Sequence, residues 1–107
     1  MTVPATRYEI LLPLRYNDGT EIEAEKLLLT KQELVQNFGA LTVNPQPVEG
    51  VWTYQGAEYQ DLLFKYIVDV EQDTTQTQEF FQKFKDVLKV RFKQFDIWIV
   101  AYPIRVI

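Results

Sequence analysis

One segment near the carboxyl end constrains the fold of this sequence more than any other. Large apolar side chains recur there at the spacing of an α-helix. The members of this stripe are Phe80, Phe81, Phe84, Val87, Leu88, Arg91, Phe92 and Phe95. The pattern predicts a helix from about Thr75 to Gln94, and the capping-box spacing of Thr75 and Gln78 indicates where it begins. The sequence therefore contains at least one long amphipathic helix.

A second stretch of helical period predicts a helix from Glu23 to Phe38. Its stripe consists of Ala24, Leu27, Leu28, Lys31, Leu34, Val35 and Phe38. Gly39 follows at the position that a C-cap glycine occupies. Glu21, Glu23 and Glu25 lie near the amino end, where the helix dipole favours negative charge. Both ends of this helix are thus predicted from local residues.

Four further segments have the pattern of strands. They are Tyr8–Tyr16, Gly50–Tyr54, Glu58–Glu71 and Asp96–Ile107. The stretch ALTV before the second of them reads as the start of a strand that NPQP then interrupts. The pair Gln55-Gly56 predicts a tight turn that joins the second and third strands. The expected core face of the third strand consists of Leu62, Phe64, Tyr66, Val68 and Val70.

Two prolines limit where the strands can lie, because proline has no amide hydrogen to donate to a neighbouring strand. Pro13 is expected at a bulge or at the end of the pairing of the first strand. Pro103 indicates that the last strand is an edge strand. These positions restrict the possible strand orders.

The predicted order is strand, helix, strand, strand, helix, strand, which is the plan of a ferredoxin-like, split-βαβ α+β domain. We expect a four-stranded antiparallel sheet in the order 4-1-3-2, with both helices on one face. A chain of 107 residues has the usual size of one domain, so residues 1–107 are expected to form a single domain.

The two faces of the last strand are both rich in apolar residues. Ile97, Ile99 and Ala101 alternate with Trp98, Val100 and Tyr102. An edge strand with one wet face does not normally have this composition. We therefore expect something to cover the face of the sheet that the helices leave free, and a second copy of the chain, giving a homodimer, is the simplest cover.

Cysteine and histidine are both absent. The lack of cysteine excludes disulfides, thiolate metal sites and cysteine nucleophiles. The lack of histidine excludes the usual catalytic triads and zinc hydrolases. We expect no cofactor and no metal. The carboxylates Asp69, Glu71 and Asp73 resemble the start of a calcium loop, but the glycine and the distal glutamate of that loop are missing, so a solvated turn is expected.

The net charge of -4 disfavours nucleic acid and anionic membranes as partners. The basic residues Lys83, Lys85, Lys89, Arg91 and Lys93 are interpreted as a solvated face, partly paired with the glutamates of the first helix. RNA-recognition domains share the predicted topology, but DLLFKYIVDV lacks the basic-Gly-aromatic pattern of their third strand. No signal peptide and no apolar run of bilayer length is present, so we expect a cytoplasmic protein.

A pocket between helices and sheet would offer several polar side chains. The candidates for ligand binding are Arg15, Trp52, Tyr54, Asp61 and Lys65, with Tyr59 and Tyr66 as neighbours. A buried Asp61 beside tyrosines could have a raised pKa and act as a base. The alternative is that Asp61 lies in water at the end of the hairpin and that the tyrosines are packing residues. No catalytic residue is assigned.

Several short motifs spread over nearly the whole chain carry a resemblance. They are Asp18-Gly19, Phe38-Gly39, Leu41-Thr42, Gly50 with Trp52, and Arg91-Phe92 with Gln94. In these motifs the chain resembles a family of small uncharacterised bacterial proteins, including cyanobacterial ones. The resemblance implies a ferredoxin-like fold and no particular activity.

The sequence thus leaves three functional hypotheses. The leading one is a non-catalytic binding or assembly module that acts as a homodimer. The second is a cofactor-independent enzyme or small-molecule binder with its pocket near Trp52, Tyr54 and Asp61. The third is recognition of a protein partner through an edge strand.

Overall fold

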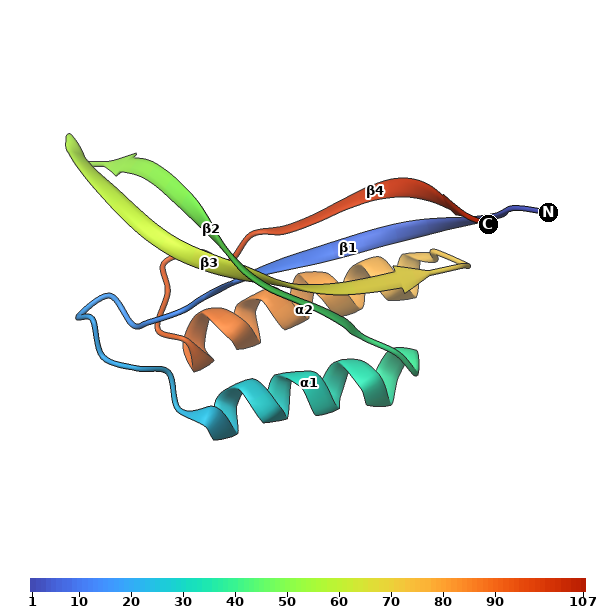
Figure 1. Cartoon of the computed structure of the whole chain (residues 1–107), viewed down its shortest axis with the longest axis horizontal. Coiled ribbons are helices and arrows are strands. Elements are labelled where there is room, and N and C mark those ends of the chain that lie inside the picture. Colours follow the sequence, from blue (N-terminus) through green and yellow to red (C-terminus); the bar gives the residue numbers. More distant parts are fainter.

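The computed structural model describes residues 1–107 and contains the six predicted elements in the predicted order (Figure 1). Their bounds are β1 Val3–Pro13, α1 Ala24–Phe38, β2 Thr42–Tyr54, β3 Ala57–Val70, α2 Thr75–Arg91 and β4 Ile99–Val106. The strands form one antiparallel sheet in the order β2-β3-β1-β4. This is the ferredoxin-like α+β arrangement that the sequence predicts.

Both helices cover the same face of the sheet and run in opposite directions (Figure 1). The carboxyl end of α2 therefore lies beside the amino end of α1, where Lys26 Nζ donates to the carbonyl oxygen of Arg91 at 2.8 Å. Arg91 forms its ion pair with Glu33, at 2.5 Å. The expected pairing between the two helices is present, but its acidic partner lies a few turns further along α1 than the glutamates at the amino end.

The ends of the helices follow from local backbone chemistry. Gly39 has a φ of 82° and its N–H donates to Val35 O at 2.7 Å, so it is the predicted left-handed C-cap. At the start of α2 the cap is Thr74, whose hydroxyl accepts from Thr77 N–H at 3.2 Å. The capping motif was therefore predicted one residue too late. The helix also ends at Arg91 and not at Gln94, and Lys93 has a φ of 54°.

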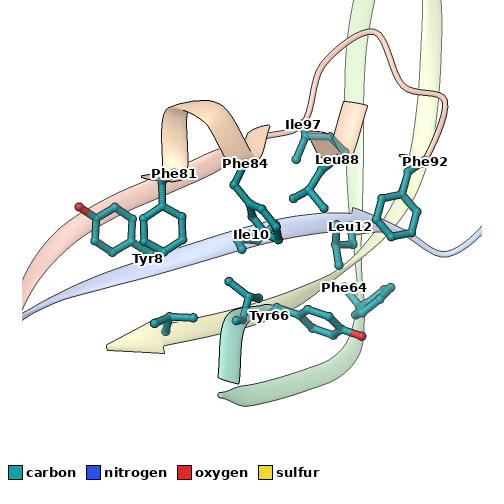
Figure 2. Close-up of a cluster of buried hydrophobic side chains, with 12 residues drawn as sticks. Tyr8, Ile10, Leu12, Phe64, Tyr66, Phe81, Phe84, Leu88, Phe92 and Ile97 are labelled. Atoms are coloured by element: carbon teal, nitrogen blue, oxygen red, sulfur yellow. The ribbon is translucent and has the colours of Figure 1, made fainter. Parts of the chain in front are cut away.

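The core lies between the sheet and the helices (Figure 2). Every second side chain of β1 and β3 points into it, since alternate residues of a strand share a face. The ring of Tyr8 stacks on that of Phe81 with 4.0 Å between centroids, and Leu34 of α1 is fully buried. Of the expected core face of β3, Phe64, Tyr66 and Val68 are buried, whereas Leu62 is 56% exposed because β3 extends beyond the helices there.

Two strands differ in extent from the prediction. The strand β1 begins at Val3, and Pro13 is its last residue, as expected of a proline that ends the pairing. The strand β2 is continuous from Thr42 to Tyr54 and is not split by NPQP. A register shift between Asn44 and Val48 absorbs both prolines of that motif, because a bulge needs no ladder hydrogen bond from them.

Pro103 lies on the edge strand β4, as predicted. Leu11 N–H donates to Trp98 O at 2.9 Å. Together with the register of the two strands, this bond shows which residues of β4 form backbone hydrogen bonds with β1. Inward and outward backbone groups alternate along an antiparallel strand. Pro103 therefore occupies a position whose backbone nitrogen faces away from β1, where no hydrogen bond is lost.

The hairpin of β2 and β3 continues beyond the other two strands and curves away from the helices (Figure 1). The pairing of β3 with β1 ends at Leu63, opposite Pro13. Beyond it, residues 50–54 of β2 pair only with residues 57–61 of β3, and Gln55 and Gly56 form the turn. We call this two-stranded projection the distal ribbon. Its two outer edges have no strand partner.

Candidate functional site

A cleft of about 320 Å³ lies between the distal ribbon, the end of β1 and the connection from α2 to β4. Apolar side chains of Leu11, Leu63 and Ile97 contribute to its wall. Gly50 leaves room for the side chain of Leu63. A Cβ at position 50 would lie only 3.3 Å from Leu63 Cδ1. The glycine beside Trp52 is thus explained by the close packing behind the cleft.

The distal ribbon supplies the central pair of the cleft, Trp52 and Asp61. The indole N–H of Trp52 donates to Asp61 Oδ2 at 2.6 Å. Tyr59, opposite Trp52 on the neighbouring strand, stacks on its ring at 4.5 Å between centroids. Cross-strand pairs of this kind stabilise a ribbon and fix the side-chain positions. Asp61 is therefore half-buried and oriented, and does not lie free in water.

A second cleft of about 400 Å³ adjoins the first. The two clefts share five residues, which are Pro13, Asn17, Trp52, Asp61 and Phe95. Arg15 lines only the second cleft, and its Nη1 donates to Gly19 O at 3.3 Å. The Trp52–Asp61 pair thus forms a wall that both clefts use.

The structure brings together three of the five predicted site residues. Trp52 and Asp61 line both clefts, and Arg15 lines the second. Tyr54 lines neither, and its ring lies 5.5 Å from that of Phe95. Lys65 lines neither cleft, and it lies further along β3, opposite Leu11 of β1, where it pairs with Glu9 at 3.1 Å.

Tyr59 and Tyr66, the two tyrosines suggested as neighbours of these candidates, lie in different parts of the structure. Tyr59 lines the second cleft beside Trp52. Tyr66 belongs to the core, where it is 1% exposed and burial raises its pKa to about 12. Tyr66 is therefore a packing residue.

Sequence reasoning missed the contribution of the α2–β4 connection. Phe95, Asp96 and Trp98 from this segment line the first cleft. Phe95 falls on the helical stripe, and nothing in the sequence indicates that α2 stops at Arg91. The only signal in the sequence was that Trp98 belongs to a predicted strand with two apolar faces.

The face of the sheet opposite the helices, which we call the open face, carries a second group of polar residues. Glu9 is 8% exposed, pairs with Lys65, and accepts a short hydrogen bond from the hydroxyl of Tyr102. This hydrogen bond and Lys65 hold the pKa of Glu9 below its usual range, against the effect of burial. Next to them, Arg7 and Asp69 form a salt bridge at 2.9 Å.

The chemistry available at these sites is limited. No group of three or more carboxylates is placed to hold a metal ion. Asp61 accepts its hydrogen bond from an indole, and no other titratable side chain is bonded to it. A side-chain nucleophile is typically activated by a base within hydrogen-bond reach.

Comparisons with known proteins show which solved structures have a similar fold. No protein-family model matches the chain, and no curated protein matches its sequence. Among solved structures, a phage SAM lyase in complex with S-methyl-5'-thioadenosine is similar, with a TM-score of 0.64, 15% identity, and coverage of 95% of this chain and 90% of that one.

Two further structures are similar to the chain. The divalent cation tolerance protein CutA1 from Thermus thermophilus has a TM-score of 0.59 and 20% identity, and the match covers 94% of this chain and 84% of that one. CutA1 from Oryza sativa has a TM-score of 0.59 and 14% identity, with coverage of 96% and 82%. At these identities the likeness establishes the fold alone. Neither helix is long and apolar enough to cross a membrane.

Proposed function

We propose that the protein is a cytoplasmic, non-catalytic assembly module that acts as a homodimer. The observation that carries this proposal is the distal ribbon, whose two outer edges have no strand partner. An isolated two-stranded ribbon is marginally stable in water. The Trp52–Tyr59 stack helps to hold it, and a second copy packed on the ribbon would stabilise it further.

The large exposed area of the chain supports the proposal that a second copy covers part of its surface. The chain exposes 7420 Å², whereas a compact monomer of 12.6 kDa exposes about 6,200 Å². The radius of gyration is 14.7 Å, against about 13 Å for a compact domain of this length. The excess area is larger than the area of about 800 Å² that one partner buries in a standard interface.

The open face is also suited to contact with a second copy. Where β1 and β3 pair, four charged side chains of this face, Glu9, Asp69, Arg7 and Lys65, are already paired within the chain. A second copy can cover paired charges without leaving any of them unsatisfied, which is the costly case. Apolar residues surround the pairs, among them Ile104, which is half-buried.

The edges of the sheet disfavour the alternative of extending the sheet from copy to copy. On β4, the outward position of Pro103 has no N–H to offer. On β2, Pro45 and Pro47 fall in the irregular stretch. Proline on an edge strand blocks continuous pairing with another strand. We therefore expect packing through faces and through the distal ribbon.

A matched pair of substitutions tests this proposal. Leu62→Glu changes a leucine at the base of the distal ribbon that is 56% exposed, and Leu28→Glu changes one on α1 that is 55% exposed. Sedimentation at micromolar concentration is expected to give a dimer for the wild type and for Leu28→Glu, and a monomer for Leu62→Glu. A monomeric wild type refutes the proposal, and dissociation by Leu28→Glu alone places the interface on the helices.

A second candidate function is binding of a small molecule in the first cleft. Its apolar wall and its few oriented polar groups are typical of ligand sites. The phage SAM lyase, which is similar to this chain in fold, was solved with S-methyl-5'-thioadenosine, so this kind of fold can carry a ligand. A screen of small molecules by the shift in melting temperature tests this candidate, and a complete lack of ligands contradicts it.

A further inference from the structure

We infer that the first cleft selects small organic cations, that is, protonated or quaternary amines attached to an aromatic or similarly apolar body. This inference rests on the second candidate function, binding of a small molecule in that cleft. Three properties carry it, which are the charge of the lining residues, their aromatic content and the division of the cleft into an apolar and a charged part.

All the charged side chains that line the first cleft are acidic. Asp61 and Asp96 line the cleft, and no lysine or arginine does. Asp96 is compensated by Lys85 at 3.0 Å. Asp61 has no ion-pair partner in the structure, and Arg15 lines only the neighbouring cleft. Asp61 is therefore a half-buried carboxylate that a bound cation would compensate.

Aromatic rings contribute the second property. Trp52, Phe95 and Trp98 all line the cleft. Phe95 and Trp98 are 71% and 66% exposed, which is unusual for such large apolar side chains without a partner. The faces of aromatic rings attract cations, and tryptophan does so most strongly. Rings and a carboxylate at one cleft together favour an ammonium group.

The third property concerns the rest of the ligand. Leu11, Leu63 and Ile97 offer an apolar wall beside the charged group. A volume of about 320 Å³ suits a molecule of the size of an arylalkylamine. An anion would face Asp61 with no lining cation to offset the repulsion, so phosphate-bearing ligands are disfavoured here. The cleft thus combines apolar contact with selection for positive charge.

The chain contains its own reporters for this site. Its two tryptophans are the only ones in the sequence, and both line the cleft. A ¹H–¹⁵N spectrum therefore shows two indole N–H signals, and both come from the proposed site. The substitution Trp98→Phe assigns them while it keeps an aromatic ring in place.

The probes form a series of nearly equal size and different charge. They are 2-phenylethylammonium, 2-phenylethanol and phenylacetate, each titrated at pH 7 while the two indole signals are followed. We expect the cation to bind about tenfold more tightly than the neutral alcohol. Phenylacetate is expected to bind more weakly than the alcohol. Binding of all three probes with equal affinity overturns the inference and leaves the second candidate function intact.

The variant Asp61→Asn removes the charge and keeps an oxygen that can accept the Trp52 N–H. We expect it to lower the affinity for 2-phenylethylammonium about tenfold and to leave that for 2-phenylethanol unchanged. The control Glu58→Gln removes a negative charge from the distal ribbon outside the cleft and is expected to change neither affinity. An unchanged cation affinity in Asp61→Asn contradicts the inference. If no probe shifts either indole signal, the second candidate function fails as well.

Discussion

Arg7 and Asp69 oppose each other on β1 and β3 and are joined by two hydrogen bonds, from Arg7 Nε to Asp69 Oδ1 at 2.9 Å and from Arg7 Nη2 to Asp69 Oδ2 at 3.0 Å. This pair raises the pKa of the Arg7 guanidinium further above its usual value. A two-pronged bond of this kind has a fixed geometry. It lies on the open face, where the proposed second copy would cover it.

The substitution Asp69→Asn is expected to weaken the homodimer more than the monomer. In the monomer the pair is about one-third exposed, so its loss costs about 1 kcal/mol or less. In the dimer the change would bury an uncompensated Arg7, which costs several-fold more. Sedimentation equilibrium gives the dimer affinity, and urea unfolding at low concentration gives the monomer stability. Equal effects on the dimer affinity and on the monomer stability would argue against burial of Arg7 in the interface. Asp86→Asn on α2 is the control for the loss of a negative charge outside the open face.

The pairing of Glu9 predicts a loss of stability in acid. Because the folded-state pKa of Glu9 is lowered, its contribution is present above the unfolded-state pKa of about 4.3 and disappears as the pH falls through the folded-state pKa. Glu9→Gln is expected to cost about 1 to 3 kcal/mol at pH 7, and this cost is expected to shrink as the pH falls through the lowered folded-state pKa of Glu9. Denaturant unfolding at several pH values measures this difference. A constant difference would contradict the prediction, and the exposed Glu49→Gln should show none.

Three tyrosines predict a loss of stability in alkali. Burial raises the pKa of Tyr66 to about 12, burial and a hydrogen bond to Asp73 raise the pKa of Tyr8, and the bond to Glu9 raises that of Tyr102. Their contribution is complete below the unfolded-state pKa of about 10 and is lost as the pH rises through the folded-state values. Absorbance at 295 nm should show a late step near pH 12 that accompanies unfolding, and Tyr66→Phe should reduce its amplitude.

Two leucines of α1 test the location of the core. Leu34 is fully buried, so Leu34→Ala is expected to lower the free energy of unfolding by about 2 to 5 kcal/mol. Leu28 is 55% exposed on the same helix, and Leu28→Ala should change it by about 0.5 kcal/mol or less. Urea unfolding of both variants at one protein concentration makes the comparison. A similar cost for the two would mean that α1 packs through a different face.

The fold could be predicted because each element has its own local signal. The period of the apolar residues identifies both helices, and Gly39 fixes the end of α1 through its backbone conformation. The order of elements then leaves one common topology. The prediction that two prolines interrupt β2 was wrong, because a bulge accommodates both of them within the strand.

The candidate site could be predicted only in part. Trp52 and Asp61 lie on the two arms of one hairpin, and the turn at Gln55 and Gly56 sets their register. The placement of Phe95 and Trp98 depends on where α2 ends, and the helical spacing continues past that point. The position of Lys65 depends on Glu9, which is far away in the sequence and meets it only through the pairing of β1 with β3. Contacts of this kind have no local signal.

The outward position of Pro103 limits how far the sheet can be extended by strands of other chains at the β4 edge. An open edge strand with a full set of N–H groups can recruit further strands without end, which is how fibrils grow. The proline removes a donor in the middle of β4, on its outer side. In the proposed homodimer this proline would disfavour polymerisation along the sheet at the β4 edge, which fits an assembly with closed symmetry.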